Sequence, residues 1–235
     1  MPPSLHTRVT ETVGRSIVDG TVPAGTVLLS EEIERSQGVS HSVIREAIRV
    51  LGSMGLVESV KRVGIRVLPA SSWNVYDPTL IRWRLLGPGK GDQLRSLTEL
   101  RSAVEPLAAE LAAGQAQPAL AADLREVAEL MRSAGDSGDL AGFLELDIRF
   151  HRLVLQGSGN EMFAKLHEPI AAVLSGRTDL GMMPDHPHQN TLQLHEDVAA
   201  AIQNRRPEKA RAAMERIMRR TFAEVRPAWA AESAP

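Results

Sequence analysis

Apolar residues recur along this chain in two different patterns, and the change comes near residue 70. Before it, short segments with helical spacing end at glycines, and two β-prone runs rich in Val follow at 56–60 and 65–67. Beyond residue 96, Ala- and Leu-rich stretches keep the 3.6-residue spacing of amphipathic helices. We therefore expect a small N-terminal domain with a hairpin and a larger, all-helical C-terminal domain.

Capping residues and turn residues place the expected elements. Ser30 precedes a segment with acids in its first turn, and Ser40 or Ser42 precedes the next, as N-caps do. In the first part, helices are expected at 7–19, 31–37 and from Ser40 or Ser42 to 54, with strands at 56–60 and 65–67. In the second part, helices are expected at 96–113, 119–134, 139–157, 160–177, 189–203 and 206–228. Pro and Gly cluster between the two parts, so we place a linker at 70–95, the N-terminal domain at 1–69, the helical domain at 96–228 and a tail at 229–235.

Composition excludes several classes of protein. The 235 residues carry 43% hydrophobic side chains and a net charge of −2, which fits a globular protein and not a uniformly basic one. Cysteine is absent, which excludes disulfide frameworks, Cys-ligated zinc and cysteine nucleophiles. No apolar run approaches the roughly 20 residues that span a bilayer. Met1–Ser4 lacks the features of a signal peptide, so we expect a cytoplasmic protein without a membrane partner.

Two of the N-terminal helices form a pattern typical of DNA-binding proteins. The segments 31–37 and 40–52 are joined by Gly38, so the second would be the reader helix of a helix-turn-helix. His41, Arg45 and Arg49 are spaced i, i+4, i+8 and stack on one side of it. The opposite side is an apolar, inward-facing stripe of Ile44, Ala47, Ile48 and Leu51.

The predicted hairpin adds positive charge beside the reader helix. Lys61 and Arg62 lie in its turn and Arg66 in its second strand, so residues 40–66 carry five Lys or Arg, two acids and a local net charge of +3. Arginine can donate to guanine O6 and N7, and hairpin cations can contact phosphates. A charge run alone is typical of a solvated face. The order of helix, glycine turn, basic helix and basic hairpin favours DNA binding instead.

These residues resemble a known family. The segment 38–51, GVSHSVIREAIRVL, followed by GLVE at 55–58, is similar to the winged helix-turn-helix signature of the GntR family of bacterial repressors. The resemblance implies double-stranded operator DNA as a partner, Arg45 and Arg49 on bases or phosphates, and Gly64 at the wing tip. The expected DNA-binding residues are Ser40, His41, Ser42, Arg45, Arg49, Lys61, Arg62 and Gly64.

The chain departs from the family pattern at two places in this domain. His41 stands where the family usually has Arg after the turn serine. Glu31 and Glu32 stand near the start of the second helix, where the family usually offers an Arg. We therefore expect an operator sequence or affinity that differs from the common family pattern.

Three polar side chains interrupt the apolar stripes of the C-terminal helices. Asp147 and His151 are i, i+4 on a stripe that also holds apolar residues, and His195 lies on the apolar face of another helix. Burying such groups is costly unless something pairs with them. Two interpretations remain open. The side chains form either a hydrogen-bonded Asp–His pair or a metal site.

Residues 96–228 resemble the FadR-type helical domain of this family, through 99–106, 147–151 and 195–202. In metal-binding members an Asp and three His hold a divalent cation beneath a carboxylate effector. The resemblance assigns the first three ligands to Asp147, His151 and His195, whereas the fourth position reads Ile217. It thus implies an incomplete site for Zn, Ni or Mn, completed by water or effector, with metal-free effector binding as the alternative. His186 and His188 could substitute, although their Pro-flanked loop favours solvent exposure.

Two arginines are candidate anion contacts. Arg101 shares a helix stripe with apolar residues, and a fixed guanidinium pairs bidentately with a carboxylate. A buried ion pair with an acid such as Asp147 explains it equally well. Arg177, at the end of the fourth helix, is a weaker candidate.

The linker helps to rank the effectors. Trp73, Asn74, Asp77 and Trp83 are similar to the linker of galactonate-responsive and other sugar-acid repressors of the family, although interdomain packing also explains the aromatic residues. A sugar acid such as gluconate or galactonate therefore ranks first. Short hydroxy or keto acids such as lactate and pyruvate rank second. A fatty acyl-CoA does not suit a polar cavity.

We thus expect a mainly α protein, a winged helix-turn-helix followed by an antiparallel helical bundle, that acts as a homodimeric repressor controlled by a small carboxylate. A dimer is expected because two reader helices must fit successive major grooves, roughly 34 Å apart. One alternative is a metal-dependent enzyme using Asp147, His151 and His195, although no general base stands outside that set. The other is a DNA-binding protein with a vestigial helical domain, which Ile217 suggests.

Overall fold

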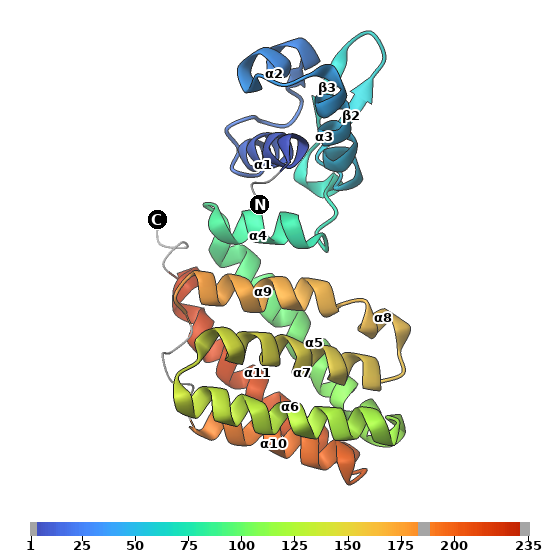
Figure 1. The fold of residues 1–235 in the computed structure, drawn as a ribbon, viewed down its shortest axis with the longest axis vertical. Coiled ribbons are helices and arrows are strands. Elements are labelled where there is room, and N and C mark those ends of the chain that lie inside the picture. The colour runs from blue at the N-terminus through green and yellow to red at the C-terminus, as the bar shows by residue number, and fades with distance from the viewer. Residues whose placement is uncertain (1–3, 183–188, 231–235) are drawn as a thin grey trace. The chain divides into compact units, whose positions relative to one another are not determined.

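The computed structural model describes residues 4–182 and 189–230. The chain divides into two compact units, residues 1–89 and residues 90–235 (Figure 1). The first combines helices with a small sheet and the second is helical throughout its described residues. The expectation of a mainly α fold with an N-terminal winged helix and a C-terminal helical domain is confirmed.

The first unit is a three-helix core with a three-stranded antiparallel sheet. The sheet order is β1-β3-β2, and Glu58 of β2 faces Arg66 of β3. The core lies between α1, α3 and the sheet, and its centre includes Ile44, Leu51 and Leu56. The elements are α1 Leu5–Val18, β1 Val27–Leu28, α2 Ser30–Gln37, α3 His41–Ser53, β2 Val57–Val60, β3 Gly64–Val67, a 3₁₀ turn at Ala70–Ser72 and α4 Pro78–Leu86.

The turn between α2 and α3 depends on Gly38. Its φ of 63° is left-handed, a conformation that glycine adopts at little cost at the end of a helix. The predicted cap Ser30 is instead the first residue of α2, with Leu29 as N-cap. Ser40 is the N-cap of α3, as one of the two alternatives predicted, although its side chain bonds Ser42 Oγ at 3.0 Å and not a helix N–H.

Helix α4 and strand β1 were missing from the predicted elements. Helix α4 begins with two strong signals, Asp77, whose side chain accepts from the N–H groups of Thr79 and Leu80, and Pro78 at the first helical position. The prediction missed it because Pro, Gly and Ser on both sides made the segment 70–95 resemble a continuous linker. Strand β1 has two residues, too few to show an alternation.

Trp83 fixes α4 against α1. Its side chain is buried, and its ring lies so close to Gly14 that a Cβ on Gly14 would be 2.2 Å from a ring carbon. Gly14 is therefore a packing requirement, because any side chain there would displace the indole.

Replacing Gly14 with alanine is expected to lower the free energy of unfolding of the first unit by about 1–3 kcal/mol, the usual cost of overpacking. Gly114 is a matched control, because it is also helical but has no heavy atom within 4 Å of the place that a Cβ would take. Gly114→Ala should stabilise by up to about 1 kcal/mol, since alanine favours helix. Chemical denaturation of both variants measures the difference, and equal stabilities would contradict the packing assignment.

The second unit is a bundle of helices. Helix α5 packs along α11, and α6 packs against α7 and α10 (Figure 1). Apolar residues from these helices form one continuous core. The helices are α5 Lys90–Gln115, α6 Pro118–Ser137, α7 Leu140–Gly157, α8 Glu161–Ala164, α9 His167–Asp179, α10 Gln189–Gln203 and α11 Pro207–Ala230.

The helix expected at 160–177 is two helices, α8 and α9, separated by a turn at Lys165–Leu166. Pro169 supplies the physical reason. It has no N–H to donate to the carbonyl of Lys165, so a continuous helix would lose a hydrogen bond there. In the first turn of α9 that N–H would have no helical partner, so the proline is tolerated.

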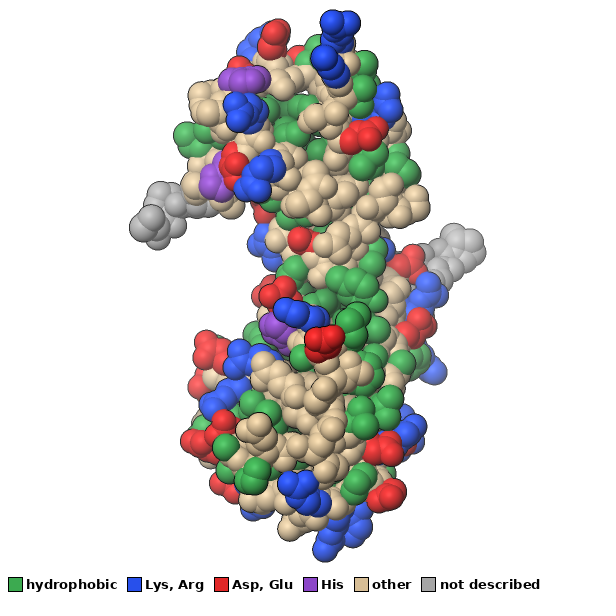
Figure 2. Space-filling view, turned by 90° about the vertical axis from the view of Figure 1, so that its right-hand side faces the viewer, with side chains coloured by type: hydrophobic (Ala, Val, Ile, Leu, Met, Phe, Trp, Pro, Cys, Tyr) green, Lys and Arg blue, Asp and Glu red, His purple; other side chains and the backbone are tan. Residues whose placement is uncertain are grey.

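The surface carries mixed charge. On the face drawn in Figure 2, Lys and Arg side chains are interspersed with Asp and Glu side chains. Within the described ranges, none of the helices has both the length and the apolar character needed to cross a bilayer.

Candidate functional site

Five helices of the second unit enclose a small polar cavity of about 40 Å³. Its wall also has apolar residues, among them Ile217 of α11, the position where the family resemblance places a fourth histidine. A cavity of this volume holds an ion or a few waters but not a six-carbon acid, because a single water already needs about 10–15 Å³ of cavity volume. The ionisable side chains that line it are Arg101, Asp147, His151, Arg177, His195, Arg220 and Glu224.

The three predicted metal ligands meet in this cavity. Asp147 Oδ1 lies 3.4 Å from His151 Nε2 and 3.4 Å from His195 Nε2. All three side chains are buried, and their candidate ligand atoms lie within 4.8 Å of one another. Asp147 Oδ1 and His195 Nε2 have no hydrogen-bond partner within the described part of the chain. Buried polar atoms left this way are costly, so their convergence indicates a site for a guest.

The donor set and its spacing fit a divalent cation. Two ligand atoms about 2.1 Å from a tetrahedral ion are about 3.4 Å apart, as Asp147 is from each histidine. His195 Nδ1 lies 2.8 Å from the carbonyl oxygen of Thr191, to which it donates, so the lone pair of the ring is on Nε2. His151 Nδ1 likewise faces a carboxylate, that of Glu105, at 2.5 Å. Both outer contacts turn an Nε2 lone pair toward Asp147.

Arg101 forms a buried ion pair with an acid, as one alternative held, and the acid is Glu105, not Asp147. Arg101 Nε donates to Glu105 Oε1 at 2.5 Å, and the two side chains are 2% and 0% exposed. Arg101 Nη2 also lies 3.1 Å from His151 Nε2, to which it donates. In this arrangement Arg101 occupies the lone pair that a metal ion would need.

The electrostatics of the cluster follow from these contacts. Burial raises the pKa of Glu105, but the guanidinium of Arg101 and the His151 imidazole outweigh it and lower that pKa to about 2. The pKa of Asp147 also lies well below its ordinary value, because His151 and His195 outweigh burial. Burial lowers the pKa of His151, but Glu105 and Asp147 reverse this and raise it. Both carboxylates are therefore ionised at neutral pH.

A second charged group lines the cavity from α9 and α11. Arg177 Nη2 donates to Glu224 Oε2 at 3.0 Å, and Arg220 Nε donates to Glu224 Oε1 at 2.9 Å. Arg177 is thus a buried cavity residue, not an exposed helix end.

Sequence reasoning gave no functional role to Glu105, Arg220 or Glu224. A usable signal was present, because Arg101–Glu105 and Arg220–Glu224 are i, i+4 pairs on helices with an apolar stripe. That signal does not say which helices face each other. The candidates His186 and His188 lie outside the described residues.

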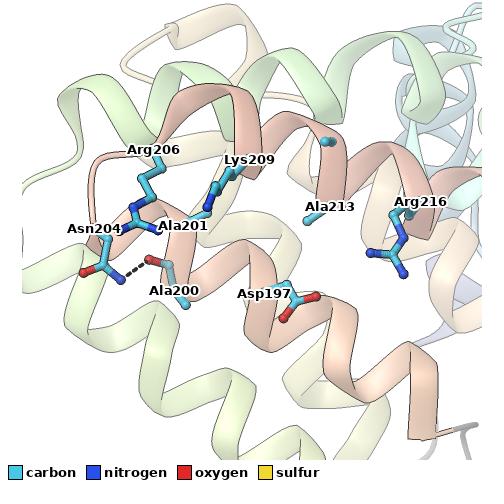
Figure 3. Close-up of a pocket in the computed structure, with 9 residues that line it drawn as sticks. Asp197, Ala200, Ala201, Asn204, Arg206, Lys209, Ala213 and Arg216 are labelled. Atoms are coloured by element: carbon cyan, nitrogen blue, oxygen red, sulfur yellow. Dashed lines mark hydrogen bonds between the residues drawn. The ribbon is translucent and has the colours of Figure 1, made fainter.

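A larger groove on α10 and α11, about 310 Å³, is a weaker candidate. Its floor is formed by alanines, with Arg206, Lys209 and Arg216 along one side and Asp197 on the other (Figure 3). The three cations are exposed, so water solvates their charges and no ligand is needed to balance them.

The predicted DNA-reading residues lie on the first unit. Arg45 and Arg49 are exposed on α3 and border a groove between this helix and strand β2. Arg49 is held by Glu46, with Nη2 2.6 Å from Oε1, whereas Arg45 has no ion pair within residues 4–182 or 189–230. Arg45 is therefore free to meet a base or a phosphate.

The turn of the hairpin presents two further cations. Lys61 and Arg62 are exposed, and Arg62 has a left-handed φ of 62°. Gly64 is the first residue of β3, opposite Val60, so it lies at the base of the turn and not at its tip. At the start of α3, His41 Nδ1 lies 2.6 Å from Glu34 Oε1, so α2 orients the imidazole.

Comparison with protein families divides the chain at nearly the same place. Residues 5–67 match the model of bacterial regulatory proteins of the gntR family. Residues 96–220 match the FCD domain.

Individual relatives span most of the chain. It is 30% identical over 200 residues to the galactonate operon transcriptional repressor of Escherichia coli (strain K12), covering 84% of this chain and 86% of the relative. It is 26% identical over 212 residues to the "Probable D-xylose utilization operon transcriptional repressor" of Paenarthrobacter nicotinovorans, covering 90% and 84%. Among solved structures, E. coli McbR/YncC shares the fold with a TM-score of 0.56 and 19% identity, covering 97% of this chain and 100% of that one.

Helix α3 and the basic hairpin thus lie in the region that matches the gntR family model, and the buried cluster lies in the region that matches the FCD domain. These matches confirm the resemblance seen in the sequence and exclude the enzyme alternative, since the matched proteins are regulators. The chain belongs to the gntR family of bacterial transcription regulators and carries a C-terminal FCD domain.

Proposed function

We propose that this protein is a homodimeric repressor whose binding to operator DNA is controlled by a small carboxylate, with sugar acids such as gluconate or galactonate first among the candidates. The observation that carries the effector half is the buried cavity in which Arg101, Asp147, His151 and His195 converge with unpartnered polar atoms. The name of the galactonate relative supports the choice of a sugar acid.

The DNA half of the proposal rests on α3 and the hairpin. Arg45 reads a base edge or holds a phosphate, with Arg49 one turn further along the same face. Lys61 and Arg62 contact the phosphate backbone, and His41, Ser40 and Ser42 lie at the end of α3 that enters the groove first. One reader helix gives little specificity, so a symmetric dimer on a palindromic operator is expected.

The effector half rests on Arg101. Its guanidinium donates to His151 Nε2 in this structure and can donate instead to a carboxylate that enters the cavity. Asp147, His151 and His195 would hold a divalent cation such as Zn²⁺, Ni²⁺ or Mn²⁺. Bound there, the ion would supply a Lewis-acidic centre for carboxylate and hydroxyl oxygens. With Ile217 in the fourth place, the three ligands leave positions open to the effector.

The size of the cavity links binding to a change of conformation. At about 40 Å³ it is too small for a six-carbon acid, so side chains or helices must move when such a ligand binds. An effector releases DNA only to the extent that it binds the non-binding conformation more tightly than the binding one.

Operator release tests the proposal. The operator is first selected from a random double-stranded library by binding to the full-length protein. Fluorescence anisotropy then follows the complex as gluconate or galactonate is added. We expect the wild type to release the operator, and Asp147→Asn and His195→Gln to bind the operator as before but to respond at least about tenfold less, since each loses a contact to the bound cation or effector.

Three results would contradict parts of this proposal. Induction that survives both substitutions would place the effector elsewhere. Thermal unfolding that is unchanged by a panel of acids and divalent ions would favour a vestigial helical domain. A failure to select any operator would count against the DNA-reading surface.

A further inference from the structure

The wall of the cavity formed by α9 and α11 has more positive than negative charge. Arg177 and Arg220 both donate to the carboxylate of Glu224. One carboxylate balances only one of two guanidinium groups, so this wall keeps one unbalanced positive charge.

The Arg177 guanidinium is also incompletely bonded. The residue is 4% exposed, and its Nε has no hydrogen-bond partner among the described residues. Burial, and next the charge of Arg101, lower the pKa of Arg177, as expected where a second cation lies near a poorly solvated guanidinium. An anion beside Arg177 would accept the free N–H and screen this repulsion.

The side of the cavity formed by α5, α7 and α10 carries one net negative charge. Arg101 and Glu105 cancel, which leaves the negative charge of Asp147 beside the two histidines. A divalent cation held by Asp147 would leave that side with one positive charge. Each of the two sides would then carry one positive charge and could pair with one negative group of a ligand.

We propose that Arg177 and Arg220 form a second anion subsite, so that the preferred effector is a hydroxy acid with a second acidic group, a carboxylate or a phosphate, at the end remote from Arg101. This inference rests on the proposed function, because it takes the first acidic group of the effector to be bound by Arg101. It narrows the effector from sugar acids in general to those with two acidic groups, which are called dianions below although a phosphate ester carries up to about one further charge.

Matched ligands test the inference. Gluconate, glucarate and 6-phosphogluconate share a six-carbon chain and differ at its end, as do glycerate, tartronate and 3-phosphoglycerate with three carbons. Isothermal titration of the full-length protein in buffer with MnCl₂ compares their affinities. We expect a dianionic member of one series to bind at least about tenfold more tightly than its monoanionic counterpart, the usual effect of one charge-assisted hydrogen bond. Within each series, the affinities of the dicarboxylate and of the phosphate ester are then compared. The tighter binder shows whether the second subsite prefers a carboxylate or a phosphate.

The variant Arg177→Gln links this preference to the subsite. Glu224 keeps Arg220 as a partner in this variant, so the wall stays paired. We expect the advantage of the dianion to disappear while the affinity for the monoanion changes less than about threefold. Arg216→Gln, an exposed arginine of α11 outside the cavity, is the matched control and should keep the advantage.

The outcomes separate this inference from the proposed function. If monoanions and dianions bind equally, or if Arg177→Gln weakens both to the same extent, the second subsite is wrong and the proposed effector cavity stands. If none of the six acids binds and galactonate also fails to bind, the proposed function itself fails and this inference falls with it.

Discussion

Replacing Glu105 with alanine is expected to destabilise the helical domain by about 3–5 kcal/mol, the usual cost of removing one partner from a buried ion pair. Glu105 is 0% exposed and contacts both Arg101 and His151. Without it, the Arg101 guanidinium would keep its charge in the interior, and among the described residues only the His151 lone pair would remain as a hydrogen-bond partner. Since folded domains are stable by about 5–15 kcal/mol, this single change would remove a large part of the total.

Chemical denaturation of the full-length protein measures this loss. Glu110→Ala is the matched control, because Glu110 also pairs with an arginine, Arg211 at 2.8 Å, but near the surface. Such a pair contributes about 0–1 kcal/mol. A second variant, Glu105→Gln, keeps the shape of the side chain and a hydrogen-bond acceptor. Its loss of unfolding free energy should lie between those of Glu105→Ala and Glu110→Ala. Equal effects of Glu105→Ala and Glu110→Ala would show that the buried network contributes little to stability.

Replacing Arg45 with alanine is expected to abolish specific operator binding without unfolding the protein. The side chain is exposed on α3 and has no ion pair within the described ranges, so its loss leaves no buried group unpaired. One bidentate contact to a base contributes about 1–3 kcal/mol of discrimination, and in a symmetric dimer the loss counts twice. Affinity should therefore fall by a factor on the order of thirty to twenty thousand.

Anisotropy titration with the selected operator checks this expectation, and circular dichroism confirms that the variant is folded. Arg125→Ala, an exposed arginine of the helical domain, should bind as the wild type does. Retained sequence-specific binding by Arg45→Ala would mean that another element reads the operator. A fall that is equal on specific and random DNA would assign Arg45 to a phosphate.

Repeating local patterns made the secondary structure of this chain predictable. The ends of α6, α7, α10 and α11 were expected within about three residues, because an amphipathic stripe with capping residues is a property of neighbouring positions. Helix α5 instead begins at Lys90, six residues before its expected start and within the expected linker. The reader helix and hairpin were predicted for the same reason. Helix α4 was missed because its nine residues show little apolar periodicity between Pro- and Gly-rich flanks.

The sequence by itself determined which residue types stand on the apolar stripes, and so indicated Asp147, His151 and His195 as buried polar groups in need of partners. Only the tertiary structure decided those partners. Arg101 and His151 are 50 residues apart in the chain, and Arg177 and Glu224 are 47 apart. Helical periodicity fixes the face on which a side chain lies, but packing of the helices decides which faces meet. The contact between Arg101 and His151, the pairing of Arg177 with Glu224 and the size of the cavity are therefore properties of the bundle, not of any one helix.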